Sequence, residues 1–147
     1  NGFVNVPWEK ETSEEYMGKL KIKAPNILTL CGNLSGGNQQ KVILSKWLAA
    51  GVKLLILDEP TKGIDVNARA EFYALMDQFV EEGGSIIMVS SDMPEIIKVA
   101  DRAYVMSEGR LTGELTRSEI TELNLISLAN PVSDGSDKKP KKKAGKK

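Results

Sequence analysis

Two short stretches of this chain contain residues that could bind a phosphate and activate water. The first reads Leu34-Ser35-Gly36-Gly37-Asn38-Gln39-Gln40-Lys41. Ser35 can cap a helix, and the two glycines let backbone N–H groups approach an anion at the helix N-terminus, where the helix dipole favours negative charge. This stretch is a candidate phosphate site, although Ser-Gly-Gly by itself is more often a flexible turn.

The second stretch is an apolar run from Leu54 to Leu57 that ends in two carboxylates, Asp58 and Glu59. Such a run suits a parallel strand that is buried on both faces, and ligands of open parallel sheets gather at the carboxyl ends of the strands. Asp58 is placed to hold Mg²⁺, directly or through water, because hard cations prefer oxygen ligands. Glu59 is placed to orient or deprotonate an attacking water. The acidic pair could equally be a solvated strand end.

Helices and a second strand are predicted around these motifs. Apolar residues at helical spacing follow Gly37, so the glycine turn should open an amphipathic helix. A second helix is expected over about 67–82 and should end at Gly83 and Gly84. Its predicted apolar face consists of Ala70, Tyr73, Ala74, Met76, Phe79 and Val80. Residues 85–90 then form a second buried-strand candidate, which should lie parallel to the first.

The flanking segments have weaker patterns. Acidic residues precede a possible helix over about 13–20. After the second strand, residues 91–95 should turn into a short helix that reaches about Ala100. Residues 103–106 and 111–115 flank Glu108-Gly109-Arg110, which predicts a β-hairpin. Thr116 and Glu119 form a capping-box pattern, so a last helix should start there and run to about Ala129. The predicted fold class is therefore α/β, a parallel sheet flanked by helices with a small C-terminal hairpin and helix.

Composition is ordinary for one modest soluble domain of 147 residues, with 41% hydrophobic and 27% charged residues. No apolar run is long enough to span a bilayer, and no signal-peptide pattern opens the chain. Cys31 is the single cysteine and there is no histidine, so an internal disulfide is excluded and a zinc site or histidine-based catalysis is not expected.

Charge is distributed unevenly. Seven of the twenty basic residues and no acid lie in Lys138 to Lys147, so the rest of the chain has thirteen basic against twenty acidic residues. Residues from Ser133 onward are polar and lysine-rich, and we expect them to be disordered. Such a tail could contact acidic lipid or RNA. A solvated tail is the commoner explanation.

The two motifs, in this order and spacing, resemble the signature motif and the Walker B segment of ATP-binding cassette (ABC) ATPases. The wording of residues 34–42, of Thr61-Lys62-Gly63-Ile64-Asp65-Val66 and of Ser90-Ser91-Asp92-Met93-Pro94-Glu95 is similar to the second nucleotide-binding half of monosaccharide importers. The resemblance covers about Lys21 to Leu128. It implies part of a P-loop NTPase fold, with the remainder of a helical subdomain at 1–33, the C-terminal part of the ATPase core at 34–130 and a lysine-rich tail at 131–147.

The resemblance also implies roles for individual residues. Asp58 would hold Mg²⁺, Glu59 would act on the attacking water, and Asp65 matches the aspartate of the D-loop. Ser91 would be a second catalytic residue, because it stands where many ABC ATPases have a histidine; its hydroxyl can accept or donate one hydrogen bond but cannot carry a positive charge near neutral pH. The signature residues would contact the ATP of the partner half; these are Leu34, Ser35, Gly36, Gly37, Asn38 and Gln39.

On this resemblance the cofactors are ATP and Mg²⁺, and the full-length protein would be an ATP hydrolase that drives monosaccharide import. The pattern G-x-x-x-x-G-K-[S/T] occurs nowhere in the sequence, so the chain is expected to be a C-terminal fragment without activity of its own. Expected partners are a second ATPase half, transmembrane permease subunits and, indirectly, a solute-binding protein, but no nucleic acid. The expected location is peripheral, on the cytoplasmic face of the membrane.

Three alternatives remain open from the sequence. The chain could be a regulatory or binding module that has the ABC fold and does not hydrolyse ATP. It could belong to an ABC importer of nucleosides or of a signalling sugar, because these share closely similar motifs. It could also come from a soluble ABC ATPase of repair or translation, although the sugar-importer wording disfavours that origin.

Overall fold

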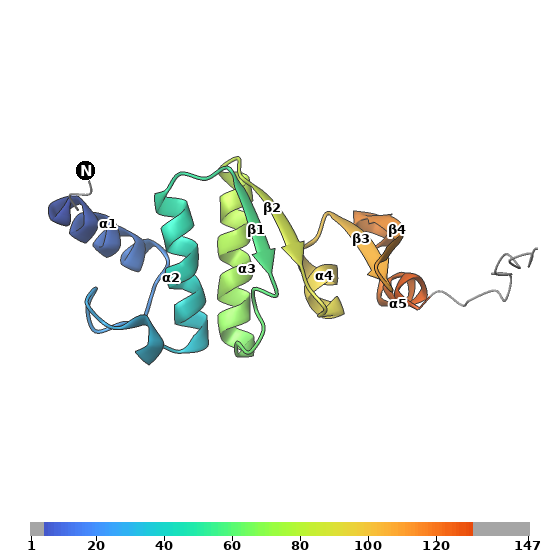
Figure 1. The fold of residues 1–147 in the computed structure, drawn as a ribbon, viewed down its shortest axis with the longest axis horizontal. Coiled ribbons are helices and arrows are strands. Elements are labelled where there is room, and N and C mark those ends of the chain that lie inside the picture. The colour runs from blue at the N-terminus through green and yellow to red at the C-terminus, as the bar shows by residue number, and fades with distance from the viewer. Residues whose placement is uncertain (1–4, 131–147) are drawn as a thin grey trace, which may run out of the picture. The chain divides into compact units, whose positions relative to one another are not determined.

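The computed structural model describes residues 5–130, which fall into two compact units divided between Ser91 and Asp92. Unit 1 contains α1 (Val6–Lys19), a 3-10 turn (Cys31–Asn33), α2 (Gly36–Ala49), β1 (Leu54–Asp58), α3 (Val66–Glu81) and β2 (Ser85–Val89), as Figure 1 shows. Unit 2 contains α4 (Met93–Val99), β3 (Arg102–Ser107), β4 (Arg110–Thr116), a 3-10 turn (Arg117–Glu119) and α5 (Glu122–Ala129). Within the described range, no helix has both the length and the apolarity needed to cross a membrane. The lysine-rich tail lies outside these residues.

Unit 1 is a series of packed elements. Helix α1 contacts α2, α2 contacts α3, and α3 contacts β2, so α3 lies between α2 and the strands (Figure 1). Strands β1 and β2 are parallel, with Leu54 opposite Ser85 and Asp58 opposite Val89. This confirms the predicted parallel pair. Because the strands run the same way, the residues that follow Asp58 and Val89 meet at one edge of the sheet.

Helix α3 matches its predicted range to within a residue. Asp65 caps its N-terminus, and Gly83 follows its C-terminus with φ +89°, a conformation that glycine adopts without strain. The buried side chains are Phe72, Tyr73, Met76 and Phe79. The predicted face was wrong at three positions that are exposed, Ala70, Ala74 and Val80. Two neighbours, α2 and β2, set the buried stripe, and the larger aromatic side chains occupy it.

The sheet differs from the prediction that both of its faces are buried. Leu55 is buried, but Ile56 is 70% exposed and Ile87 and Val89 are each more than half exposed. These side chains alternate along the strands, so they lie on one face while Leu55 lies on the other. The described helices of unit 1 cover one face only, and this leaves the second face apolar and open.

Two helix starts were also predicted wrongly. Helix α1 begins at Val6, not near Ser13, because the Asn5 side chain accepts a hydrogen bond from the Trp8 N–H and a proline stands in the first turn. The capping box at Thr116 and Glu119 forms, but it opens only a 3-10 turn. Helix α5 has its own cap at Thr121, whose hydroxyl accepts from the Asn124 N–H.

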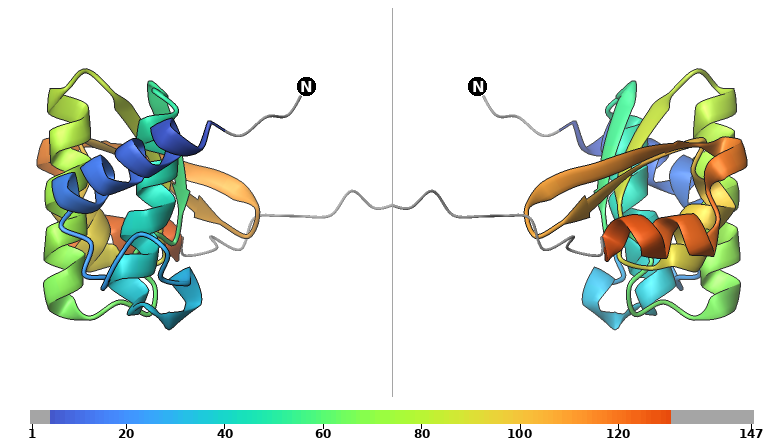
Figure 2. Two further views of the ribbon diagram at one scale, coloured as in Figure 1. Left: turned by 90° about the vertical axis from the view of Figure 1, so that its left-hand side faces the viewer. Right: turned by 90° about the vertical axis from the view of Figure 1, so that its right-hand side faces the viewer.

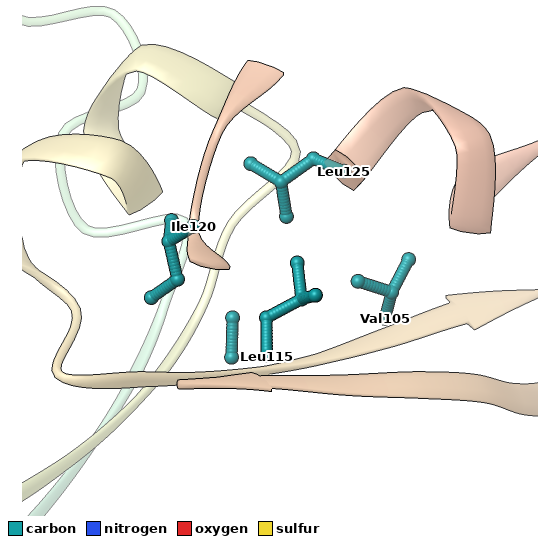
Figure 3. Close-up of a cluster of buried hydrophobic side chains, with 5 residues drawn as sticks. Val105, Leu115, Ile120 and Leu125 are labelled. Carbon is teal, nitrogen blue, oxygen red and sulfur yellow. The ribbon is translucent and has the colours of Figure 1, made fainter. Parts of the chain in front are cut away.

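Unit 2 is built on the predicted hairpin. The connecting residues Glu108 and Gly109 have φ of +48° and +74°, the pair of positive values that a tight hairpin turn requires. Helix α5 packs along the hairpin, as the right-hand view of Figure 2 shows. Figure 3 shows the resulting core, to which the strands, the residue after the 3-10 turn and α5 all contribute; its buried members are Ala103, Val105, Leu115, Ile120 and Leu125.

Candidate functional site

The first motif forms a turn that leads directly into α2. Ser35 occupies the N-cap position with extended backbone, yet its hydroxyl makes no capping hydrogen bond to the helix. That hydroxyl oxygen accepts a hydrogen bond of 2.8 Å from the Asn38 side-chain amide. The Gln39 side chain donates to the Leu34 carbonyl at 2.9 Å. The polar side chains of the motif therefore hold its own turn together.

The second glycine of the motif is buried against the start of α3. A Cβ atom at Gly37 would lie 2.5 Å from the Cβ of Ala68 and 3.2 Å from the Cγ2 of Ile64. A Cβ atom at Gly36 would lie at an ordinary 3.6 Å from the Gly63 carbonyl oxygen. The close approach of two helix ends therefore requires a glycine at position 37, independently of any bound anion.

A cavity of about 220 Å³ lies beside this contact. Four predicted site residues line it: Ser35, Gly37, Asn38 and Asp65. The other lining residues were not predicted as site residues, and they are Lys23, Lys41, Asn67, Ala68 and Glu71. Asp65 also caps α3, because its carboxylate accepts a hydrogen bond of 2.9 Å from the Ala68 N–H. The structure thus brings the glycine motif and the predicted D-loop residue to one cavity.

An ion pair between two of the residues that line the cavity joins α2 to α3. Lys41 is 3% exposed, and its Nζ lies 2.6 Å from Oε2 of Glu71. The hydrogen bond from Lys41, its positive charge and the charges of Lys23 and Lys21 lower the pKa of Glu71 below its ordinary value of 4.5. The position of Lys41, four residues after Gly37, puts both on one side of α2. No local sequence pattern identifies Glu71 as its partner.

We expect the protein to lose stability in acid partly through Glu71. Its pKa is lower in the folded than in the unfolded state, so its stabilising contribution is complete above about 4.5 and disappears as pH falls through the folded value. Glu71→Gln removes this contribution. Urea denaturation of both proteins should show a stability difference near neutral pH that shrinks below the ordinary pKa of the carboxyl group. A difference that stays constant with pH would contradict the assignment.

The second motif lies at the carboxyl ends of β1 and β2. Glu59 has a left-handed backbone with φ +46°, which is unusual for a residue with a side chain. Its N–H donates to the Val89 carbonyl at 2.8 Å, and its Oε1 accepts from the Ser91 N–H at 3.0 Å. The last residue of β2 therefore holds the main chain of Glu59, and Ser91, two residues later, holds its carboxylate. The contact from Ser91 comes from its main chain and not from its hydroxyl.

Asp58 can supply one oxygen to a magnesium ion. It is exposed at the end of β1. Among residues 5–130, no group of three or more acidic, cysteine or histidine side chains is placed to hold a metal by itself. Mg²⁺ commonly takes one or two carboxylates and completes its shell with water and substrate phosphates. Asp58 fits that coordination, in which most of the ligands would come from outside these residues.

The two groups of predicted site residues remain separate. Asp58, Glu59 and Ser91 are not among the residues that line the cavity, and neither are Leu34, Gly36 and Gln39. The groups are connected through the turn after Glu59, where the Lys62 N–H donates to the Glu59 carbonyl and the Ile64 N–H donates to the Thr61 carbonyl. The residues that line the cavity and the carboxylates at the strand ends therefore form two separate groups, joined by the short segment after Glu59.

The chain is similar in sequence to known ATP-binding proteins. Residues 3–62 match the ABC transporter family. The chain is 51% identical over 127 residues to an import ATP-binding protein of Rhizobium etli for ribose, galactose or methyl galactoside, covering 86% of this chain and 24% of that protein. It is 45% identical over 133 residues to the ribose import ATP-binding protein RbsA of Yersinia pestis, covering 90% and 26%. The chain thus spans about a quarter of the length of these relatives.

Solved structures share the fold. An ATP-binding cassette of an ABC transporter, MJ1267, superposes with a TM-score of 0.73 at 18% identity, over 87% of this chain and 52% of that one. A dimeric ATP-binding cassette, MJ0796, in a post-hydrolysis state with ADP and Pi, gives a TM-score of 0.67 at 19% identity, over 80% and 50%. These similarities support the predicted fold class, as part of a larger domain.

Proposed function

We propose that the chain belongs to the ATP-binding proteins of ABC transporters and forms the C-terminal part of a nucleotide-binding domain that drives sugar import; the sequence similarities support this assignment. One observation carries the proposal. The glycine motif and Asp65, from two separate motifs of the sequence, line a single cavity at the starts of α2 and α3. The names of the relatives support a monosaccharide such as ribose or galactose as the transported substrate.

The residues divide between two nucleotides in this proposal. Ser35, Gly36 and Gly37 contact the γ-phosphate of an ATP held by the partner half. Asp58 would help to hold the Mg²⁺ of the ATP bound by this half, and the ion would neutralise charge on the phosphates. Glu59 orients the attacking water and accepts its proton. Asp65 stands between the two sites at the interface of the halves.

The same similarities support a wider assembly. The expected partners are a second ATPase half and transmembrane permease subunits, with a solute-binding protein acting through them. The full-length protein would lie peripherally on the cytoplasmic face of the membrane. Closing of the two halves on ATP and their opening after hydrolysis would drive the permease between its two forms.

Titration calorimetry with Mg-ATP tests the proposal. The chain of 147 residues should show no detectable binding, because its sequence contains no P-loop. The full-length protein should bind Mg-ATP and, assembled with its permease, hydrolyse it faster when sugar-loaded binding protein is added. Micromolar binding by the short chain would mean that it carries a complete nucleotide site. Binding without turnover by the full-length protein would favour a regulatory module.

A further inference from the structure

A chain of two hydrogen bonds fixes the side chain of Asn38. The Lys23 backbone N–H donates to Asn38 Oδ1 at 2.8 Å, and Asn38 Nδ2 donates to Ser35 Oγ at 2.8 Å. A backbone N–H can only donate, so the atom that faces Lys23 must be the amide oxygen. The amide NH₂ group must then face Ser35. The orientation of this amide thus follows from its partners alone.

This orientation determines how the Ser35 hydroxyl can act. Its oxygen accepts the hydrogen bond from Asn38, so its single proton points away from Asn38. The hydroxyl is not used to cap α2, and Ser35 lines the cavity beside the motif. The proton is therefore available to an acceptor in that cavity.

We propose that Asn38 is a positioning residue that holds the Ser35 hydroxyl as a hydrogen-bond donor to the γ-phosphate of ATP. The proposal deepens the proposed function and rests on it. Phosphate oxygens at neutral pH are acceptors, so a hydroxyl helps only when its proton faces them, whereas a rotated hydroxyl presents lone pairs to negative charge. The hydrogen bond from Asn38 keeps the Ser35 hydroxyl out of that unfavourable orientation before the nucleotide binds.

Replacing Asn38 with Asp exchanges the side-chain NH₂ group for an oxygen and reverses the direction of the hydrogen bond with the Ser35 hydroxyl. Asp keeps an oxygen to accept the Lys23 N–H, but its second oxygen can only accept, so the Ser35 proton turns toward it and away from the phosphate. The added negative charge near the start of α2 interacts favourably with the helix dipole, so we expect the variant to fold. Asn67→Asp is the matched control, because it introduces the same charge into the same cavity.

The experiment measures ATP hydrolysis by the full-length protein assembled with its permease. Asn38→Asp should lower kcat/KM for ATP by about 10- to 100-fold, the range expected for a hydrogen bond to a charged group. Asn67→Asp should lower it much less. The inhibition constant of ADP should stay the same in both variants, because ADP has no γ-phosphate. A general disturbance of the turn would not separate ATP from ADP in this way.

A double-mutant cycle with Ser35→Ala completes the test. Once the hydroxyl is absent, Asn38→Asp should cost no more than Asn67→Asp costs in the same background. Equal losses in Asn38→Asp and Asn67→Asp with Ser35 present would overturn the positioning role. An Asn38→Asp loss that persists undiminished without the hydroxyl would also overturn it. A wild-type protein that hydrolyses no ATP would instead overturn the proposed function, and the positioning role with it.

Discussion

Replacing Glu59 with Gln in the full-length protein should lower ATP turnover at this site by about 100- to 10,000-fold, the usual contribution of a general base. Gln keeps an oxygen that can accept the Ser91 N–H, so the side chain should stay in place. It loses the basicity needed to take a proton from water. Binding of Mg-ATP should remain, and steady-state turnover together with nucleotide titration would measure both effects.

Ser91→Ala provides the matched control for this prediction. Ser91 holds Glu59 through its backbone N–H, which alanine retains, so the loss of turnover should be far smaller than in Glu59→Gln. If Glu59→Gln turned over ATP at the wild-type rate, Glu59 would have no role as a base. If Ser91→Ala lost as much activity as Glu59→Gln, the hydroxyl and not the main chain would be the group that matters at position 91.

Replacing Gly37 with Ala should destabilise the domain by about 1–3 kcal/mol, the usual cost of overpacking a tight contact. The new Cβ would lie 2.5 Å from the Cβ of Ala68, so one of the two helix ends must move. The backbone at Gly37 is not in the left-handed region, so the contact alone accounts for this cost. Chemical denaturation of the full-length protein would measure the loss.

Ala68→Gly should rescue this variant. It removes the atom that the new methyl group would meet, although glycine in a helix costs up to about 1 kcal/mol by itself. The double variant should therefore be more stable than the sum of the two single losses predicts. Strictly additive losses would show that Ala68 does not limit position 37. Rescue of stability without rescue of ATP turnover would show that the glycine has a separate role toward the nucleotide.

The sequence predicted the ranges of helices and strands better than which of their faces are buried. The range of α3 was correct because local features set it, a capping aspartate at one end and a glycine pair at the other. Its buried face was partly wrong, because Phe72 is buried by neighbouring elements that a single periodicity does not describe. The continuous apolar run of β1 predicts burial on both faces, yet Ile56 is 70% exposed. How many layers cover a strand depends on other elements.

In the candidate site, too, the residues could be predicted from local motifs but the long-range contacts could not. Ser35, Gly37, Asn38 and Asp65 were predicted from two motifs, and the structure brings all four to one cavity. The long-range contacts around the site could not be predicted, because each joins residues far apart in the chain. The pair of Lys41 with Glu71 needs α2 and α3 in their packed register. The support that Ser91 gives to Glu59 needs the parallel pairing of β1 and β2.

That parallel pairing has a consequence for the order in which the chain folds. The β3–β4 hairpin closes through the turn at Glu108 and Gly109 and can form within about 1–10 μs. Strands β1 and β2 can pair only after the sixteen residues of α3 have crossed between them, and contacts between distant parts of a chain form more slowly. Both main-chain groups that hold Glu59 come from β2 and the residues after it. The Glu59 carboxylate can therefore acquire its native hydrogen bond only after β1 and β2 have paired, so slow pairing of these strands would delay formation of the site even when every helix has formed.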